Sequence, residues 1–88
     1  MQKEVARITN KRGLHARASA KIVEAAARFQ SEITISKDGQ NVNARSIMGL
    51  MMLAASLGSE ITVQAKGPDE DAAMKAMLAL IEAKFGEE

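Results

Sequence analysis

The chain has 88 residues, one histidine and no cysteine, tyrosine or tryptophan, which excludes disulfide bonds and a thiol nucleophile and argues against a metal site rich in imidazole or thiolate. Hydrophobic residues make up 47% of the sequence, but no apolar run approaches the roughly 20 residues of a membrane helix, and no secretory signal opens the chain. We therefore expect one cytoplasmic domain over residues 1–88, without membrane insertion. The formal net charge is only +1, yet residues 1–45 carry nine basic and four acidic side chains, whereas residues 46–88 carry three and seven.

The first predicted elements are a strand and a helix, with a glycine between them. Residues 3–9 alternate apolar and polar side chains, as a half-buried strand does, and Gly13 interrupts the pattern. From Ala16 to about Phe29, apolar residues recur at helical spacing among many alanines, which predicts a helix. His15 therefore lies directly before a helix start.

A hairpin, a short helix and a fourth strand follow. Residues 32–36 alternate strictly, and the turn-forming pair Asp38-Gly39 separates them from residues 41–43. Ser46 precedes an apolar segment that fits a short helix ending before Gly58. Residues 61–66 alternate again, and Gly67-Pro68 ends that strand.

The last predicted element is a helix with Asp69 as its cap. Glu70 and Asp71 suit its first turn, because a helix start favours negative charge. Gly86 is expected to end the helix, and its buried stripe would consist of Met74, Met77, Leu78, Ile81 and Phe85.

These elements predict an α+β fold with the order βαββαβα. The alternating strands have one polar face, so helices should cover only the other face. We therefore expect an open-faced β-sandwich, in which a four-stranded antiparallel sheet carries three helices on one face.

The segment Gly13-Leu14-His15-Ala16-Arg17 indicates a phosphate site. A helix start has unpaired backbone N–H groups and a partial positive charge, so it binds anions and favours a neutral imidazole, which is a nucleophile. An imidazole is a poor helix cap, which points to function, and the guanidinium of Arg17 matches phosphoryl oxygens. From spacing alone, a surface histidine beside a solvated arginine explains the segment equally well.

Basic side chains suggest a surface around His15 for acidic protein partners. The candidates are Lys11, Arg12, Arg17, Lys21 and Arg45. Nucleic acid is the competing partner, but two phenylalanines are few platforms for stacking bases, so we expect no nucleic-acid binding.

Two segments together resemble the HPr family, the histidine-containing phosphocarrier proteins (HPr/NPr) of the bacterial phosphoenolpyruvate-dependent phosphotransferase system. These are residues 13–17 and the segment Arg45-Ser46-Ile47-Met48-Gly49-Leu50-Met51, and the likeness in length and element order spans the chain. The resemblance implies that enzyme I phosphorylates His15 on Nδ1, that Arg17 and the amides of Ala16 and Arg17 hold the phosphoryl group, and that an enzyme IIA domain receives it. It implies a carrier without cofactor or metal rather than an enzyme.

One position departs from the family pattern. Members usually have proline directly after the arginine, whereas this chain has Ala18-Ser19. Proline would preset the first helical turn and remove an unpaired N–H. We expect a tolerated loss of rigidity, with Ser19 or the amide of Ala18 as an additional phosphate contact.

Ser46 has two interpretations. As a helix cap it needs no further explanation. Its flanking sequence resembles the segment that HPr kinase/phosphorylase modifies in some bacteria, which makes Ser46 a candidate regulatory phosphosite as well. A phosphate there would place negative charge on a surface that partners meet.

The helix after Ser46 holds Met48, Met51 and Met52, half of the six methionines of the chain. We expect one or two of them in the core, and the others on an apolar docking patch, because methionine adapts to several partners. The residues expected to contact partners are Ile47, Met48, Met51, Arg12 and Lys21.

Two other functions stay open at this point. An enzyme could use His15 as a general base, although it would need a second catalytic group and a substrate pocket. A regulatory module could act by docking alone, with His15 silent. The sequence leaves open whether a carrier of this kind serves sugar uptake or nitrogen-related regulation, and a monomer fits the exchange of partners.

Overall fold

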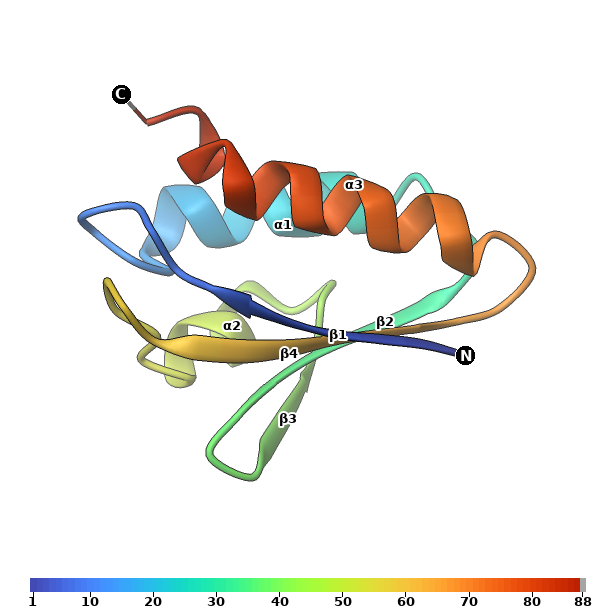
Figure 1. Ribbon diagram of the computed structural model, residues 1–88, viewed down its shortest axis with the longest axis horizontal. Helices are drawn as coiled ribbons and strands as arrows, with labels where there is room; N and C mark the ends of the chain where they lie inside the picture. Colours follow the sequence, from blue (N-terminus) through green and yellow to red (C-terminus); the bar gives the residue numbers. More distant parts are fainter. Residues whose placement is uncertain (88) are drawn as a thin grey trace.

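A computed structural model describes residues 1–87 of the chain. Within this range, strands and helices follow one another in the order βαββαβα, and a short 3-10 turn follows the last helix (Figure 1). The elements are β1 (Gln2–Arg7), α1 (Ala16–Ala26), β2 (Glu32–Lys37), β3 (Gln40–Asn43), α2 (Ile47–Met52), β4 (Glu60–Lys66), α3 (Glu70–Glu82) and η1 (Lys84–Gly86). The predicted order of elements is confirmed.

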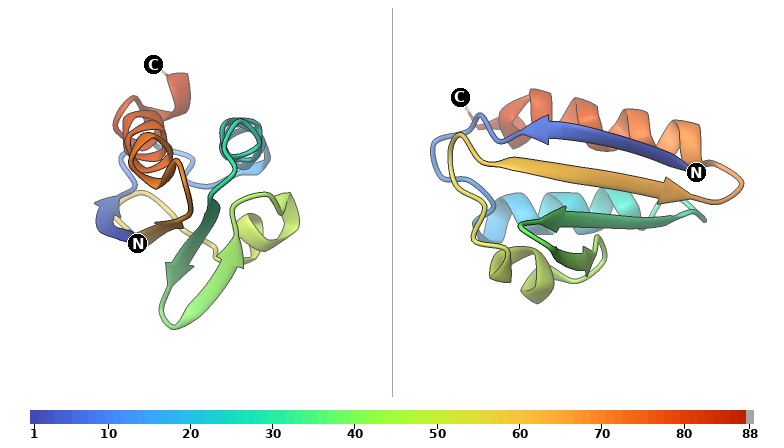
Figure 2. Two further views of the ribbon diagram at one scale, coloured as in Figure 1. Left: turned by 90° about the vertical axis from the view of Figure 1, so that its right-hand side faces the viewer. Right: turned by 60° about the horizontal axis from the view of Figure 1, so that its bottom comes forward.

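The strands form one antiparallel sheet with the order β1-β4-β2-β3 (Figure 2). The tight turn at Asp38-Gly39 joins β2 to β3, with Lys37 paired to Gln40. The two central strands are β4 and β2, and their register places Ile35 opposite Val63. Their strict alternation in the sequence therefore reflects one buried face and one open face.

Helices α1 and α3 lie antiparallel on the buried face of the sheet (Figures 1 and 2). Helix α2 packs beside α1, over the edge of the sheet formed by β3. No helix within residues 1–87 covers the opposite face of the sheet, so the structure is the open-faced sandwich that the sequence predicts. As a result, the start of α1 lies at the same end of the molecule as the end of α3 (Figure 1).

The core lies between the sheet and the two long helices. Helix α3 contacts β1 and β4 of the sheet, and α1 contacts α3 and α2. The buried residues of the layers include Ala18, Ile22 and Ala26 from α1, Ile33, Ile35, Ile61, Val63 and Ala65 from the sheet, and Met74, Met77 and Ile81 from α3.

Both long helices end earlier than the sequence predicts. Helix α1 ends at Ala26 rather than near Phe29, and α3 ends at Glu82 rather than at Gly86. Phe85 is fully buried as predicted, but its backbone has a positive φ of 57° and belongs to the turn after the helix. The helical period continues past Glu82 in the sequence, whereas the burial of Phe85 requires the chain to bend.

The prediction that Asp69 caps α3 is wrong. Its side chain makes no capping hydrogen bond. Instead, its carboxylate accepts hydrogen bonds from the amides of Gln30 and Ser31, each at 2.9 Å, and from the Ser31 hydroxyl. These hydrogen bonds lower the pKa of Asp69. The bond from the Ser31 hydroxyl has the largest effect, and the bond from the Gln30 amide has the next largest. Asp69 thus joins the start of α3 to the start of β2.

None of the helices within residues 1–87 has the length and apolar character that crossing a bilayer requires.

Candidate functional site

The loop before α1 is fixed by its backbone. Gly13 has a φ of 65°, and a Cβ atom there would lie 2.3 Å from the carbonyl oxygen of Ala55, so only glycine fits. Next to it, the amide of Leu14 donates to the same carbonyl at 2.8 Å, and the Leu14 side chain is buried. Asn10 adds a hydrogen bond from Nδ2 to the Gly13 carbonyl at 2.9 Å. These contacts fix the point at which the chain enters α1.

His15 occupies the cap position of α1, with an extended backbone. Its Nδ1 accepts a hydrogen bond from the amide of Arg17 at 3.3 Å, so the imidazole caps the helix, although an imidazole is a poor cap. The cap is long compared with the usual distance of about 2.9 Å, which fits a weak bond. The important consequence is chemical, because Nδ1 presents its lone pair to the start of the helix.

The other ring nitrogen of His15 contacts the far end of the chain. Nε2 lies within hydrogen-bond distance of one carboxylate oxygen of Glu87, and the second oxygen accepts a hydrogen bond from Nδ2 of Asn10 at 3.0 Å. The side chains of His15 and Glu87 are 22% and 18% exposed, so the contact is partly shielded from water. Both hydrogen bonds lower the pKa of Glu87, and the bond from Asn10 has a larger effect than the bond from His15.

A left-handed turn brings Glu87 to His15. Lys84, Phe85 and Gly86 all have positive φ, between 56° and 75°. Two consecutive non-glycine residues in this region are strained, and such strain persists only where the surroundings impose it. The buried Phe85 ring and a hydrogen bond from Nζ of Lys21 to the Phe85 carbonyl hold the turn in place.

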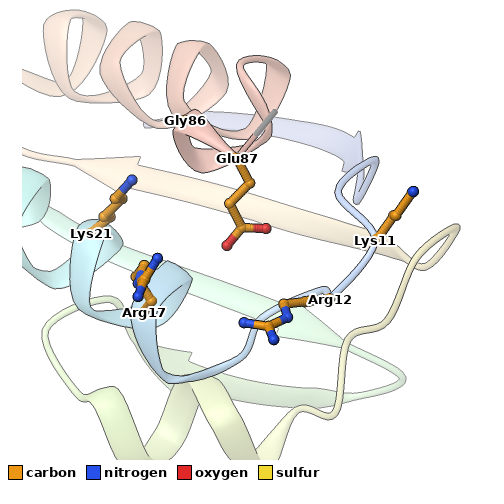
Figure 3. A pocket seen from close by; sticks show the side chains of 6 residues that line it. All are labelled: Lys11, Arg12, Arg17, Lys21, Gly86 and Glu87. Carbon is orange, nitrogen blue, oxygen red and sulfur yellow. The ribbon is translucent and has the colours of Figure 1, made fainter.

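An open cavity of about 440 Å³ borders Glu87 (Figure 3), the residue whose carboxylate contacts His15. Figure 3 shows the Glu87 carboxylate among the cationic side chains of the loop and of α1. The lining residues are Lys11, Arg12, Arg17, Lys21, Gly86 and Glu87. Four cations around one carboxylate leave this groove positive, so it attracts anions.

Arg45 does not belong to this basic groove, contrary to the prediction. Its guanidinium donates to the carbonyl oxygens of Phe29 at 2.5 Å and Ala26 at 3.4 Å, at the C-terminal end of α1. Since α1 has 11 residues, this end lies about 16 Å from the end that His15 caps. The unpaired carbonyls there attract a cation, which explains the placement of Arg45.

Ser19 does not face the groove either. It is fully buried, and its hydroxyl donates to the Leu14 carbonyl at 3.3 Å. The expectation of a phosphate contact from Ser19 is therefore wrong, because its hydroxyl serves the loop that positions His15.

Ser46 caps α2 as predicted. Its Oγ accepts a hydrogen bond from the amide of Gly49 at 3.0 Å, and the residue is half-buried. Because α2 packs beside α1, the helix that His15 starts, residues of both helices can meet one partner.

An apolar patch extends over α2 and the loop after it. Its residues are Ile47, Met48, Met51, Met52 and Leu57, which are between 40% and 72% exposed. The prediction that one or two of the α2 methionines fill the core is wrong, because Leu50 and Leu53 take that place and the buried methionines belong to α3. The residues expected to contact partners did not include Met52 or Leu57.

Sequence reasoning also missed Asn10 and Glu87 as site residues. Within residues 1–87, no group of three or more His, Asp or Glu side chains is placed to hold a metal ion. The only hint in the sequence that Glu87 belongs to the site was its acidic side chain directly after Gly86. This hint becomes informative only once the fold brings the end of α3 to the start of α1.

Comparisons with known proteins show the family of the chain. Residues 2–83 match the family model described as the PTS HPr component phosphorylation site. The phosphocarrier protein HPr of Cupriavidus necator is 56% identical over 80 residues, which cover 91% of this chain and 90% of that protein. The crystal structure of HPr-C-His from Thermoanaerobacter tengcongensis is 49% identical, with a TM-score of 0.96, and covers 100% of this chain and 99% of its own. An HPr dimer from the same organism is 48% identical, with a TM-score of 0.79 and 99% and 100% coverage.

The fold and these matches define a phosphocarrier, a protein that transports a phosphoryl group rather than catalysing a reaction in an enclosed pocket. More specifically, the chain belongs to the HPr family of the phosphotransferase system.

Proposed function

We propose that the chain carries phosphoryl groups on Nδ1 of His15, takes them from phosphorylated enzyme I and passes them to an enzyme IIA domain. This would occur in the bacterial cytoplasm, in sugar uptake or in nitrogen-related regulation. The observation that carries the proposal is the hydrogen bond from the Arg17 amide to Nδ1. A nitrogen that accepts this bond carries no proton, so its lone pair can attack phosphorus once the amide turns to the incoming phosphoryl oxygens.

The transfer needs no additional base. The Nδ1 lone pair forms the bond to phosphorus, while the bond from phosphorus to the donor atom of enzyme I breaks and its electron pair stays with the donor. The phosphoryl oxygens then lie at the start of α1, where the amides of Ala16 and Arg17 can donate to them. The exposed guanidinium of Arg17 adds a fork of donors from the side of the groove.

The site is open, which suits a protein that must meet two partners in turn. We propose that partners dock on Ile47, Met48 and Met51, while Arg12 and Lys21 attract acidic groups at the edge of the contact. We further propose that the chain acts as a monomer, because a partner must reach the groove and the patch together.

Phosphoenolpyruvate with labelled phosphorus, purified enzyme I and this protein test the proposal directly. We expect one acid-labile, base-stable label per chain, and none in a His15→Ala variant that keeps its fold by circular dichroism. Passage of the label to an enzyme IIA domain completes the test. A folded wild-type protein that takes up no label would contradict the proposal and would favour a module that acts by docking alone.

Ser46 is a second candidate site. Its hydroxyl lies at the start of α2, directly before the patch residues Ile47 and Met48. We propose that an ATP-dependent kinase modifies it, and that the added charge slows docking without unfolding the protein.

A further inference from the structure

We infer that Glu87 is a positioning residue for His15, and that its carboxylate holds the proton of the imidazole on Nε2 and so keeps Nδ1 free as the phosphoryl acceptor. The inference rests on the proposed function of His15. It extends that function to a residue 72 positions away in the sequence.

The two neighbours of the ring require the same tautomer. An ionised carboxylate has no proton to donate, so the nitrogen that faces Glu87 must be the donor. The backbone amide of Arg17 can only donate, so the nitrogen that faces it must be the acceptor. A neutral imidazole with its proton on Nε2 satisfies both contacts, whereas the opposite tautomer places two donors face to face at Nδ1 and two acceptors face to face at Nε2.

The Glu87 carboxylate is held on several sides. Nδ2 of Asn10 donates to both Glu87 and the Gly13 carbonyl, and because both neighbours are acceptors, the amide of Asn10 has only one workable orientation. That orientation leaves Oδ1 of Asn10 buried without a hydrogen bond to any described residue. Such an arrangement is costly, so its presence indicates that Nδ2 is required where it is.

The turn after α3 also fixes Glu87. The buried ring of Phe85 anchors the backbone, and Lys21 of α1 donates to its carbonyl. Glu87 thus approaches His15 from a segment that α1 itself holds in place. The charged groups that face His15 and Glu87 are the cations of the groove, and among them Arg12 and Arg17 are close to His15 in the sequence. Their positive charge favours an ionised Glu87 carboxylate.

Keeping the proton on Nε2 also assists the second transfer. After Nδ1 has bonded to phosphorus, a ring that keeps its Nε2 proton carries a positive charge, which the carboxylate offsets. When the acceptor attacks phosphorus and the bond to Nδ1 breaks, the electron pair returns to Nδ1, and the leaving group is a neutral imidazole. A ring without the Nε2 proton would have to leave as an anion, which is a poorer leaving group.

The test uses the substitution Glu87→Gln, which keeps the shape of the side chain. A glutamine has one accepting and one donating end, so it cannot accept hydrogen bonds from both Asn10 and His15. The matched control is Glu82→Gln, which removes the same charge from the exposed end of α3. His15 is the only histidine of the chain, so in protein labelled with ¹⁵N-histidine the ring signals need no assignment.

For the neutral ring, we expect the ¹⁵N shifts of a protonated Nε2 and an unprotonated Nδ1 in the wild type and in the control variant Glu82→Gln. In Glu87→Gln, the two shifts should move towards each other as the second tautomer is populated. Onward transfer from the phosphorylated variant to an enzyme IIA domain should slow by roughly 10-fold or more, by analogy with metal-binding histidines, which lose about this much when their second hydrogen-bond partner is removed.

The inference is overturned if Glu87→Gln leaves the ring shifts unchanged, and equally if the shifts move while the rate of onward transfer stays at the wild-type value. The NMR measurement does not depend on phosphorylation. A wild-type protein that accepts no phosphoryl group would therefore refute the proposed function and leave the tautomer result to be judged separately.

Discussion

The amide of Arg17 and Nδ1 of His15 face each other across 3.3 Å, so the nitrogen proposed to accept the phosphoryl group contacts the start of α1 directly. The same hydrogen bond that caps the helix orients the lone pair. When a phosphoryl group joins Nδ1, its oxygens can replace the nitrogen as acceptors of the helix amides. If His15 carries the phosphoryl group as proposed, we expect little rearrangement between the free and the phosphorylated site.

The first turn of α1 can be made more rigid without loss of transfer. In the described part of the chain the amide of Ala18 donates no hydrogen bond, so Ala18→Pro removes no bond there. We expect the free energy of unfolding to rise by about 0.4 to 1 kcal/mol, because proline restricts the unfolded chain. Urea denaturation measures this change, and labelling from enzyme I measures transfer. A large loss of transfer would show that the flexibility of this turn is needed.

The apolar patch on α2 should govern the encounter with enzyme I. Met48 is 72% exposed, so Met48→Glu should leave the fold intact while it slows phosphoryl uptake, by about tenfold or more if Met48 is a central contact. Initial rates at a subsaturating concentration of the carrier measure this effect. Val5→Glu is the matched control, because Val5 is 63% exposed on β1, outside the patch. Equal rates for Met48→Glu and the wild type would exclude Met48 from the docking surface.

Ser46 should contribute to stability through its cap, whether or not a kinase modifies it. Ser46→Ala removes the acceptor of the Gly49 amide, and the loss of such a cap typically costs about 0.5 to 2 kcal/mol. Urea denaturation measures this loss. The same variant is the control for incubation with ATP and the cognate kinase, where incorporation into the wild type alone would assign the phosphosite. No incorporation into either protein would leave Ser46 as a cap only.

The link from Asp69 to Ser31 should make stability depend on pH in acid. Because the pKa of Asp69 is lowered in the folded protein, its carboxylate stabilises the fold above the ordinary pKa of about 4, and this contribution is lost as the pH falls through the lowered value. Asp69→Asn should therefore reduce stability at pH 7 and flatten the decline below about pH 4.

Urea denaturation from pH 7 to pH 3 measures this dependence. Glu70 and Glu87 also have lowered pKa values, so part of the decline should remain in the Asp69→Asn variant. Asp38→Asn at the exposed tip of the hairpin is the control. An unchanged slope in Asp69→Asn would show that the link to β2 contributes nothing.

The layers of the fold follow from the periodicity of the sequence. Ile33 and Ile35 in β2, and the alternating residues of β4, have to enter one core, so burial imposes a period of two that is visible in the sequence. The ends of the helices are not visible in the same way. The helical period of α3 extends to Phe85, but where the helix stops depends on how that ring reaches the core.

The same distinction between local and long-range features applies to the residues of the site. The place of His15 and Arg17 at the start of α1, and the cap at Ser46, could be predicted because a helix start imposes local chemistry on residues that are close in sequence. Arg45 and Glu87 could not be placed, because their partners are 16 and 72 residues away. A sequence does not show which distant carbonyl or imidazole a flexible charged side chain will meet until the layers are assembled.

The most direct test of the account identifies the nitrogen that carries the phosphoryl group. Protein labelled with ¹⁵N-histidine and phosphorylated by enzyme I should show coupling between ³¹P and Nδ1 of His15, while Nε2 keeps its proton. Coupling to Nε2 instead, or phosphate on any other residue, would contradict the assignment of the start of α1 as the phosphoryl site.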